Sequence, residues 1–257
     1  MPLFLLKKPL TTVFKTIKMA TISKKIRFDK SGYYFIALIV LAFAGFWPSY
    51  FSKFFNHTND FNFYFHFHAT MMMLWVIMLI VQPLLIRKKQ LHLHRLIGKA
   101  SYILMPLLLT SVLMVLNNSL KKVPESQLSF NEIIFPCRDF LLLTTAYSIA
   151  ILYRHQVQIH ARAMVITGIV FIEPALFRLF GRVIFKNFPL VGFYTGVTLI
   201  LGLLVTLIIL ERKQKTGRWL FPAFLIIDVI VYCIVIFNIP LHFLDPMVIW
   251  FSKLSLT

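Results

Sequence analysis

The sequence predicts an all-α fold, a polytopic transmembrane helix bundle, and two observations carry this prediction. Of the 257 residues, 59% are hydrophobic and only 14% are charged, with a mean hydropathy of +0.79. Soluble domains are roughly 45–50% apolar and about 25% charged, so this composition excludes an ordinary soluble protein. In addition, apolar runs of about 18 or more residues, long enough to cross a hydrocarbon core about 30 Å thick, recur along the chain.

About seven such runs are expected to be membrane spans, and short polar or charged breaks separate them. Polar residues 56–60 end the first run, the basic triplet 87–89 ends the second, and Asn-Asn-Ser at 117–119 ends the third. Basic residues follow the fourth and fifth runs, and Glu-Arg-Lys at 211–213 ends the sixth. The predicted spans cover residues 33–51, 63–86, 96–116, 133–153, 164–184, 190–210 and 219–237.

The chain is predicted to hold two regions: a basic cytoplasmic tail over residues 1–31 and one transmembrane helical domain over 32–257. No break between runs is long enough for a separate domain. Whether translation starts at Met1 or Met19 stays open. Two prolines and Asp245 interrupt residues 239–251, which favours a segment at the membrane interface over an eighth crossing.

The net charge of +18 is concentrated in the breaks, where basic residues orient membrane helices, so no nucleic-acid partner is expected. With the amino terminus in the cytoplasm, nineteen of the 27 Lys and Arg residues lie on the cytoplasmic side and six on the other, while Arg138 and Arg178 lie within spans. This bias predicts a cytoplasmic amino terminus and an external carboxyl terminus. The expected partners are the bilayer and anionic lipids at its cytoplasmic face; protein partners stay open.

Five ionisable residues are expected inside the spans: Arg138, Asp139, Glu173, Arg178 and Asp228. Each costs about 2.5–3.5 kcal/mol at mid-helix unless it meets a partner or a wet cavity. One interpretation is a structural set of ion pairs among Arg138, Arg178, Asp139 and Glu173, with Arg178 paired to one of the two carboxylates. The other interpretation is a ligand or proton site.

A metal site is a further hypothesis for two of these ionisable residues, Asp139 and Glu173, together with a histidine. His68 lies near the start of the second run, and its imidazole could join the carboxylates of Asp139 and Glu173 as ligands for zinc or another divalent ion.

Two short motifs lie at the opposite, cytoplasmic face. His94 and Arg95 open the third run, and His160 and Arg162 precede the fifth. Two imidazoles at one depth can ligate a haem iron, and the neighbouring arginines can bind its propionates, so these four residues form a candidate haem-b site. The alternative is that both motifs only contact lipid headgroups.

These motifs also resemble a known family. His-Arg-x-x-Gly at 94–98 and His-x-Arg-x-Met at 160–164, with Gly-Phe-Trp-Pro-Ser-Tyr-Phe at 45–51 and Phe-His-Ala at 67–69, resemble a family of uncharacterised bacterial multi-pass membrane proteins with a domain of unknown function. The resemblance spans roughly residues 33–185. It implies a bacterial cytoplasmic (inner) membrane protein and supplies no activity.

Three functional hypotheses follow. The first is a non-enzymatic membrane factor that binds lipid or assists assembly; it accounts for the basic charge without any site and is favoured. The second is a haem-b redox protein with His94 and His160 as ligands. The third is a transporter or metal-handling protein that uses the polar residues within the spans. Whether the protein is an enzyme stays open, although no Ser-His-Asp, HExxH or phosphate-loop pattern is present.

Overall fold

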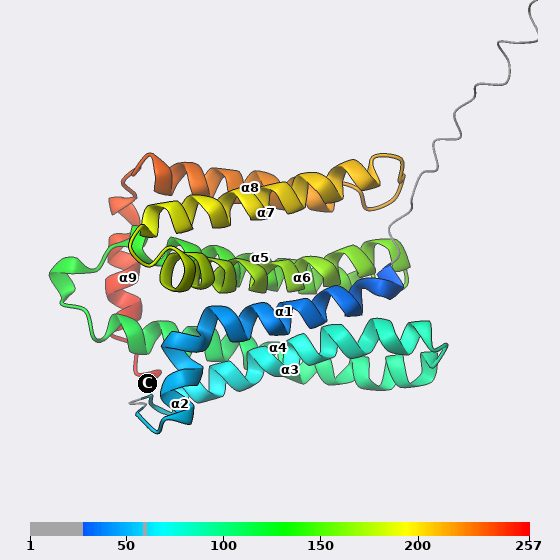
Figure 1. Ribbon diagram of the computed structural model, residues 1–257, viewed down its shortest axis with the longest axis horizontal. Helices are drawn as coiled ribbons and strands as arrows, with labels where there is room; N and C mark the ends of the chain where they lie inside the picture. The colour runs from blue at the N-terminus through cyan, green and yellow to red at the C-terminus, as the bar shows by residue number, and fades with distance from the viewer. Residues whose placement is uncertain (1–27, 59–60) are drawn as a thin grey trace, which may run out of the picture.

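The computed structural model describes residues 28–58 and 61–257, and the predicted cytoplasmic tail lies outside them except for its last residues. Long helices dominate the described part (Figure 1). In chain order the α- and π-helices are α1 (Ser31–Phe46), a π-helical turn (Trp47–Phe51), α2 (Ser52–Phe55), α3 (Phe63–Arg87), α4 (Leu91–Leu120), α5 (Phe130–Leu152), α6 (Val157–Arg178), a second π-helical segment (Leu179–Ile184), α7 (Pro189–Glu211), α8 (Leu220–Ile236) and α9 (Asp245–Ser252).

The predicted multi-pass transmembrane bundle is confirmed. Within the described residues, six helical stretches are long and apolar enough to cross a membrane: Ser31–Phe55, Phe63–Arg87, Leu91–Leu120, Phe130–Leu152, Val157–Ile184 and Pro189–Glu211. The seventh predicted span corresponds to α8, which is apolar but has 17 residues, about 25 Å of helix. It packs beside α7 along the same axis as the other helices (Figure 1).

Helix α6 is the centre of the bundle. It contacts α1, α3, α5, α7 and α8, and it is the most buried of the six long stretches. The connections α3–α4, α5–α6 and α7–α8 lie at the end where α1 begins, on the right in Figure 1. We call this the basic end, because it carries the basic residues that the sequence assigns to the cytoplasm. Its placement in the cytoplasm stays a prediction.

Two glycines let helix α1 and its neighbours approach α6 closely. A methyl group added at Gly45 of α1 would overlap the backbone carbonyl of Ala175, and one added at Gly168 of α6 would overlap the ring of Phe35. The hydrophobic effect contributes little to contacts between helices in lipid, so the close van der Waals packing that small residues allow holds such crossings together. Gly202 of α7, in contrast, has no neighbouring atom within 4 Å of the added methyl.

We therefore expect opposite effects from the same substitution at two glycines. Gly45→Ala should destabilise the bundle by about 1–3 kcal/mol, because the obstructing atom is backbone and the helices must separate. Gly202→Ala should be neutral or stabilising by up to about 1 kcal/mol, because alanine is the better helix former. Thermal unfolding in detergent micelles measures both. Equal effects at the two positions would contradict the close crossing.

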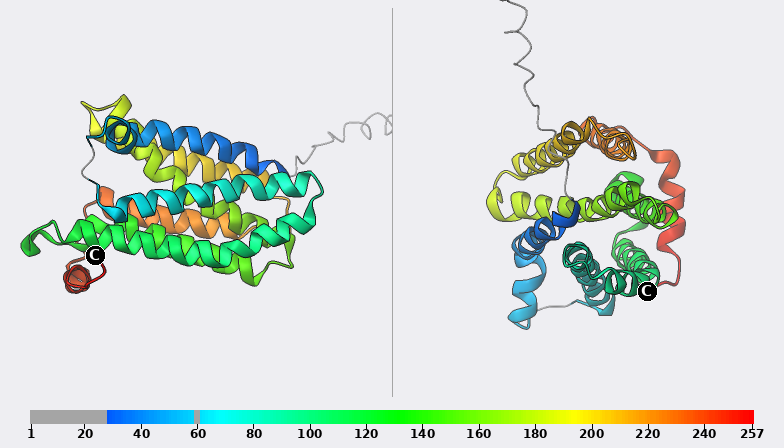
Figure 2. Two further views of the ribbon diagram at one scale, coloured as in Figure 1. Left: turned by 90° about the horizontal axis from the view of Figure 1, so that it is seen from below. Right: turned by 90° about the vertical axis from the view of Figure 1, so that its right-hand side faces the viewer.

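Helix α9 runs across the bundle axis at the end opposite to the basic end (Figures 1 and 2). Its eight residues make about 12 Å of helix, too short for an eighth crossing. Val248 of α9 packs fully buried against Leu120 and Ile133. The buried amide of Asn117 on α4 donates to the carbonyl of Phe251 at 2.7 Å, so the end of α9 is held by α4.

Asp245 joins α9 to the start of α5. The backbone N–H of Phe130 donates to Asp245 Oδ1 at 2.7 Å, and His242 Nδ1 lies 2.9 Å from Asp245 Oδ2. Both contacts favour the ionised carboxylate, and the backbone hydrogen bond is the larger cause of the lowered pKa of Asp245. Because the folded pKa lies below that of the unfolded chain, about 3.9, this contact stabilises the fold above that pH. The stabilisation is lost as the pH falls through the lowered pKa.

We expect acid to release α9 before the rest of the bundle unfolds. In protein labelled with 5-fluorotryptophan, the ¹⁹F resonance of Trp250 on α9 should change with a midpoint below pH ~4. In Asp245→Asn the same resonance should already resemble the acid form at neutral pH. A wild-type resonance that stays constant until global unfolding would contradict this role of Asp245.

Candidate functional site

Arg138 lies at the centre of a group of ionisable side chains from α5, α6 and α8. Its guanidinium Nη2 is 2.7 Å from Asp139 Oδ1 and 2.6 Å from Glu173 Oε1, and Nη1 is 3.4 Å from Asp228 Oδ1. Tyr232 follows Asp228 by one turn of α8, and its ring centroid lies 5.6 Å from the guanidinium carbon. We call these five residues the Arg138 cluster. It connects three helices near the middle of the membrane-spanning region, since Asp228 is midway along α8.

The cluster contains three carboxyl groups and one cation. If all three carboxyl groups were ionised and Tyr232 neutral, the cluster would carry a net charge of −2 in a largely buried position. Glu173 is 5% exposed and Asp228 1% exposed. Each uncompensated buried charge costs several kcal/mol. The guanidinium therefore neutralises one carboxylate, and the others need protons or a bound cation.

Several polar atoms of the cluster lack a hydrogen-bond partner among the described residues. They are both carboxyl oxygens of Asp228, the Tyr232 hydroxyl and Arg138 Nη1. Asp228 Oδ1 is within ion-pair distance of Arg138, but the pair does not have hydrogen-bond geometry. Buried polar atoms in native proteins are nearly always paired, so these atoms mark a place where a proton or ligand would satisfy them.

Asp139 is the member of the cluster that reaches the surface of the bundle. Its side chain is 25% exposed, against 3% for Arg138 and 6% for Glu173. A single carboxylate thus connects the buried part of the cluster with the surroundings of α5.

Arg178 does not join this cluster, although the sequence analysis expected it to pair with Asp139 or Glu173. It follows Glu173 by five residues on α6, about 140° further around the helix, so the two side chains leave opposite faces. Arg178 Nη1 donates to the carbonyl of Pro174 at 3.0 Å, and its guanidinium carbon lies 4.4 Å from the ring centroid of Phe46 on α1. Among the described residues, no carboxylate lies within 4.0 Å of Arg178.

The metal hypothesis for His68, Asp139 and Glu173 finds no support in the geometry. His68 Nδ1 is hydrogen-bonded to Ser111 Oγ on α4 at 3.1 Å, on the side of α6 that carries Arg178. Asp139 and Glu173 face Arg138 on the other side. Within residues 28–58 and 61–257, no group of three or more His, Cys, Asp or Glu residues is arranged to hold a metal ion.

At the basic end, His94 and His160 are half-buried and lie near each other. His160 Nδ1 is hydrogen-bonded to the carbonyl of Ala150 at 2.8 Å. The side-chain amide of Gln82 contacts His94 Nδ1 and accepts from the backbone N–H of Gly98 at 3.1 Å. These contacts hold both rings through Nδ1 and do not involve Nε2 of either ring.

The two arginines assigned to haem propionates have other roles. Arg162 is 1% exposed, and its Nε donates to Glu211 Oε2 of α7 at 2.6 Å, while Glu211 is itself 2% exposed. Arg162 is therefore neutralised inside the protein and is not free to bind a propionate. Arg95 is exposed, and its Nε lies 3.4 Å from the carbonyl of Leu91 on its own helix. Haem binding by His94 and His160 stays a prediction.

The Arg162–Glu211 ion pair was not predicted from the sequence, and Asp228 was named among the ionisable residues of the spans but not in the predicted set of ion pairs. Glu211 stands in a charged break, which is typical of a solvated loop, but the packing of α6 against α7 and the loop that follows α7 bury it. Asp228 and Tyr232 share one face of α8 at a spacing of four residues, and this spacing in an apolar helix was the available signal. The chain matches no protein-family model, no curated protein sequence and no solved structure.

Proposed function

We propose that this protein is a non-enzymatic integral membrane protein that takes up and releases protons at the Arg138 cluster, as proton-coupled transporters do. The observation that carries the proposal is Asp228, whose two carboxyl oxygens lack a hydrogen-bond partner among the described residues at mid-helix. Ionisable residues within membrane spans typically mark ion pathways and proton relays. We also propose that the protein lies in the bacterial cytoplasmic membrane. This location is supported by the basic end and by the motif resemblance.

The chemistry follows from the charge balance. A proton that binds Asp228 turns an acceptor-only carboxylate into a hydroxyl donor and lowers the net negative charge of the cluster by one. Glu173 and Asp139, which share Nη2 of Arg138, are the groups to which the guanidinium can shift when Asp228 becomes neutral. Asp139 supplies the connection to the surface because its side chain is partly exposed, whereas those of Arg138 and Glu173 are buried.

Infrared spectroscopy tests proton binding directly. Purified protein should show the carbonyl stretch of a neutral carboxylic acid near neutral pH, and Asp228→Asn should weaken this band. The matched control is Glu132→Gln, which removes an exposed carboxyl near the start of α5 and should leave the band unchanged. Absence of the band at every pH at which the protein stays folded would identify the cluster as a fully ionised, static set of ion pairs.

Transport is tested in proteoliposomes that contain a pH-sensitive dye and carry an imposed pH gradient. Small organic cations and anions are added in turn. At least one should accelerate the decay of the gradient with wild-type protein, and none should do so with Asp228→Asn. Identical decay for wild type, Asp228→Asn and protein-free liposomes would contradict transport.

A further inference from the structure

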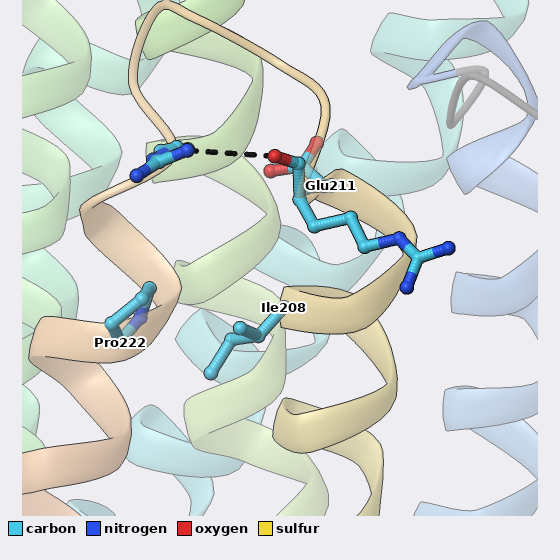
Figure 3. Close-up of a pocket in the computed structure, with 5 residues that line it drawn as sticks. Ile208, Glu211 and Pro222 are labelled. Carbon is cyan, nitrogen blue, oxygen red and sulfur yellow. Dashed lines mark hydrogen bonds between the residues drawn. The ribbon is translucent and has the colours of Figure 1, made fainter. Parts of the chain in front are cut away.

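A cavity of about 270 Å³ lies at the basic end, where α7 passes into α8. It is lined by Ile208, Glu211, Arg212, Arg218 and Pro222. Figure 3 shows Ile208 on α7 and Pro222 on α8, on the two sides of the cavity beneath the connecting loop. The cavity is separate from the Arg138 cluster, because Pro222 in the first turn of α8 lies six residues, about 9 Å along the helix, from Asp228.

Two guanidinium groups at this cavity lack a carboxylate partner among the described residues. Arg212 and Arg218 are both exposed, and Arg218 Nη1 contacts only the carbonyl of Arg212, at 3.4 Å. The acidic residue of the lining, Glu211, is already used, because its Oε2 accepts from Arg162 on the buried side. The cavity therefore carries an excess of positive charge that no described side chain neutralises.

The other lining residues are apolar and continue into the membrane-spanning surface. Ile208 lies one turn inside the end of α7, and Pro222 lies in the first turn of α8. Trp219, next to Arg218, is 49% exposed. An exposed tryptophan beside basic residues at helix ends is typical of the headgroup level of a membrane.

We propose that this cavity binds an anionic phospholipid, with the phosphate between Arg212 and Arg218 and an acyl chain along Ile208 and Pro222. Guanidinium groups recognise phosphate oxygens through paired, charge-assisted hydrogen bonds. The apolar lining distinguishes a lipid from a free phosphate ion, which gains nothing from Ile208 and Pro222. The proposal does not depend on proton binding at the Arg138 cluster.

The test measures how lipids raise the unfolding temperature of protein purified in detergent. Phosphatidylglycerol is compared with zwitterionic phosphatidylcholine and with inorganic phosphate. Arg212→Gln with Arg218→Gln removes both guanidiniums from the cavity. Lys213→Gln with Lys215→Gln is the matched control, because it removes the same charge from exposed residues of the same loop that do not line the cavity.

Phosphatidylglycerol should stabilise the wild type and the lysine double variant, with little effect of phosphatidylcholine or phosphate. Its apparent affinity for the arginine double variant should fall roughly 30-fold, as expected for the loss of two cations beside an anionic headgroup. Equal losses in the two double variants would show diffuse attraction to basic charge and would overturn the site. Equal stabilisation by inorganic phosphate would show that the cavity binds phosphate and not specifically a lipid. No response to phosphatidylglycerol would contradict both the lipid ligand and the binding site.

Discussion

Replacing Arg138 with leucine is expected to cause the largest loss of stability of any single substitution in this bundle, about 3–5 kcal/mol. The side chain is the shared cation for Asp139, Glu173 and Asp228, and its removal leaves three buried or half-buried carboxyl groups facing one another. Unfolding of the purified protein in mixed micelles, followed by circular dichroism, measures the change. Arg138→Lys should lie between leucine and wild type, because an ammonium group does not provide the planar set of donors that reaches several carboxylates.

Two comparisons separate loss of charge balance from loss of packing. Arg178→Leu removes an arginine that has a backbone hydrogen bond and an aromatic contact but no described carboxylate partner, so it should cost about 1–2 kcal/mol. Adding Glu173→Gln and Asp228→Asn to Arg138→Leu should recover part of the stability, because these changes remove the uncompensated carboxylates. A cost for Arg138→Leu no larger than that for Arg178→Leu would refute the role of Arg138 as the central cation.

Arg162→Leu is expected to have the second largest effect, again about 3–5 kcal/mol. The substitution leaves Glu211 buried without its cation and also removes the hydrogen bond from Arg162 Nη1 to the carbonyl of Gln158. The double variant Arg162→Leu with Glu211→Leu should be less destabilised than either single variant, because no buried charge remains. Arg154→Leu, an exposed arginine at the same end, is the matched control and should change stability by less than about 1 kcal/mol. Additive effects in the double variant would contradict the ion pair.

The spans were predictable because a segment that crosses the hydrocarbon core must be a helix of about 20 mostly apolar residues. Long apolar runs and the basic breaks between them identified every helix from α3 to α7, with ends that differ from the observed ones by up to seven residues. The run predicted at 219–237 matches α8 to one residue at each end, whereas α6 begins at Val157, seven residues before the predicted start at 164. Which ionisable residues meet was harder to predict, because it depends on the rotation of each helix. Depth alone grouped Arg178 with Glu173, although about 140° of helix rotation separates them.

Residues that stand in charged breaks were the other source of error. Glu211 and Arg162 lie where the sequence predicts contact with solvent or headgroups, yet the loop that follows α7 covers them. Gly217 in that loop has a φ of 75°, and its Cα lies over the pair, because a methyl group added there would be 3.5 Å from Arg162 Nη1. A positive φ favours glycine, so the turn depends on this residue. The sequence showed the glycine but not what it covers.

The Arg138 cluster has a consequence for how the chain enters the membrane during synthesis. Helix α5 carries both Arg138 and Asp139 and is the least apolar of the six long stretches. When α5 leaves the ribosome, Arg138 has only Asp139 of its three carboxyl partners, because Glu173 and Asp228 are not yet made. At about 5–20 residues per second, the chain from Asp139 to Asp228 takes on the order of 5–20 seconds to appear. We therefore expect α5 to stay at the insertion machinery or at its edge until α6 emerges, and to become a stable span only once later helices supply its remaining carboxyl partners.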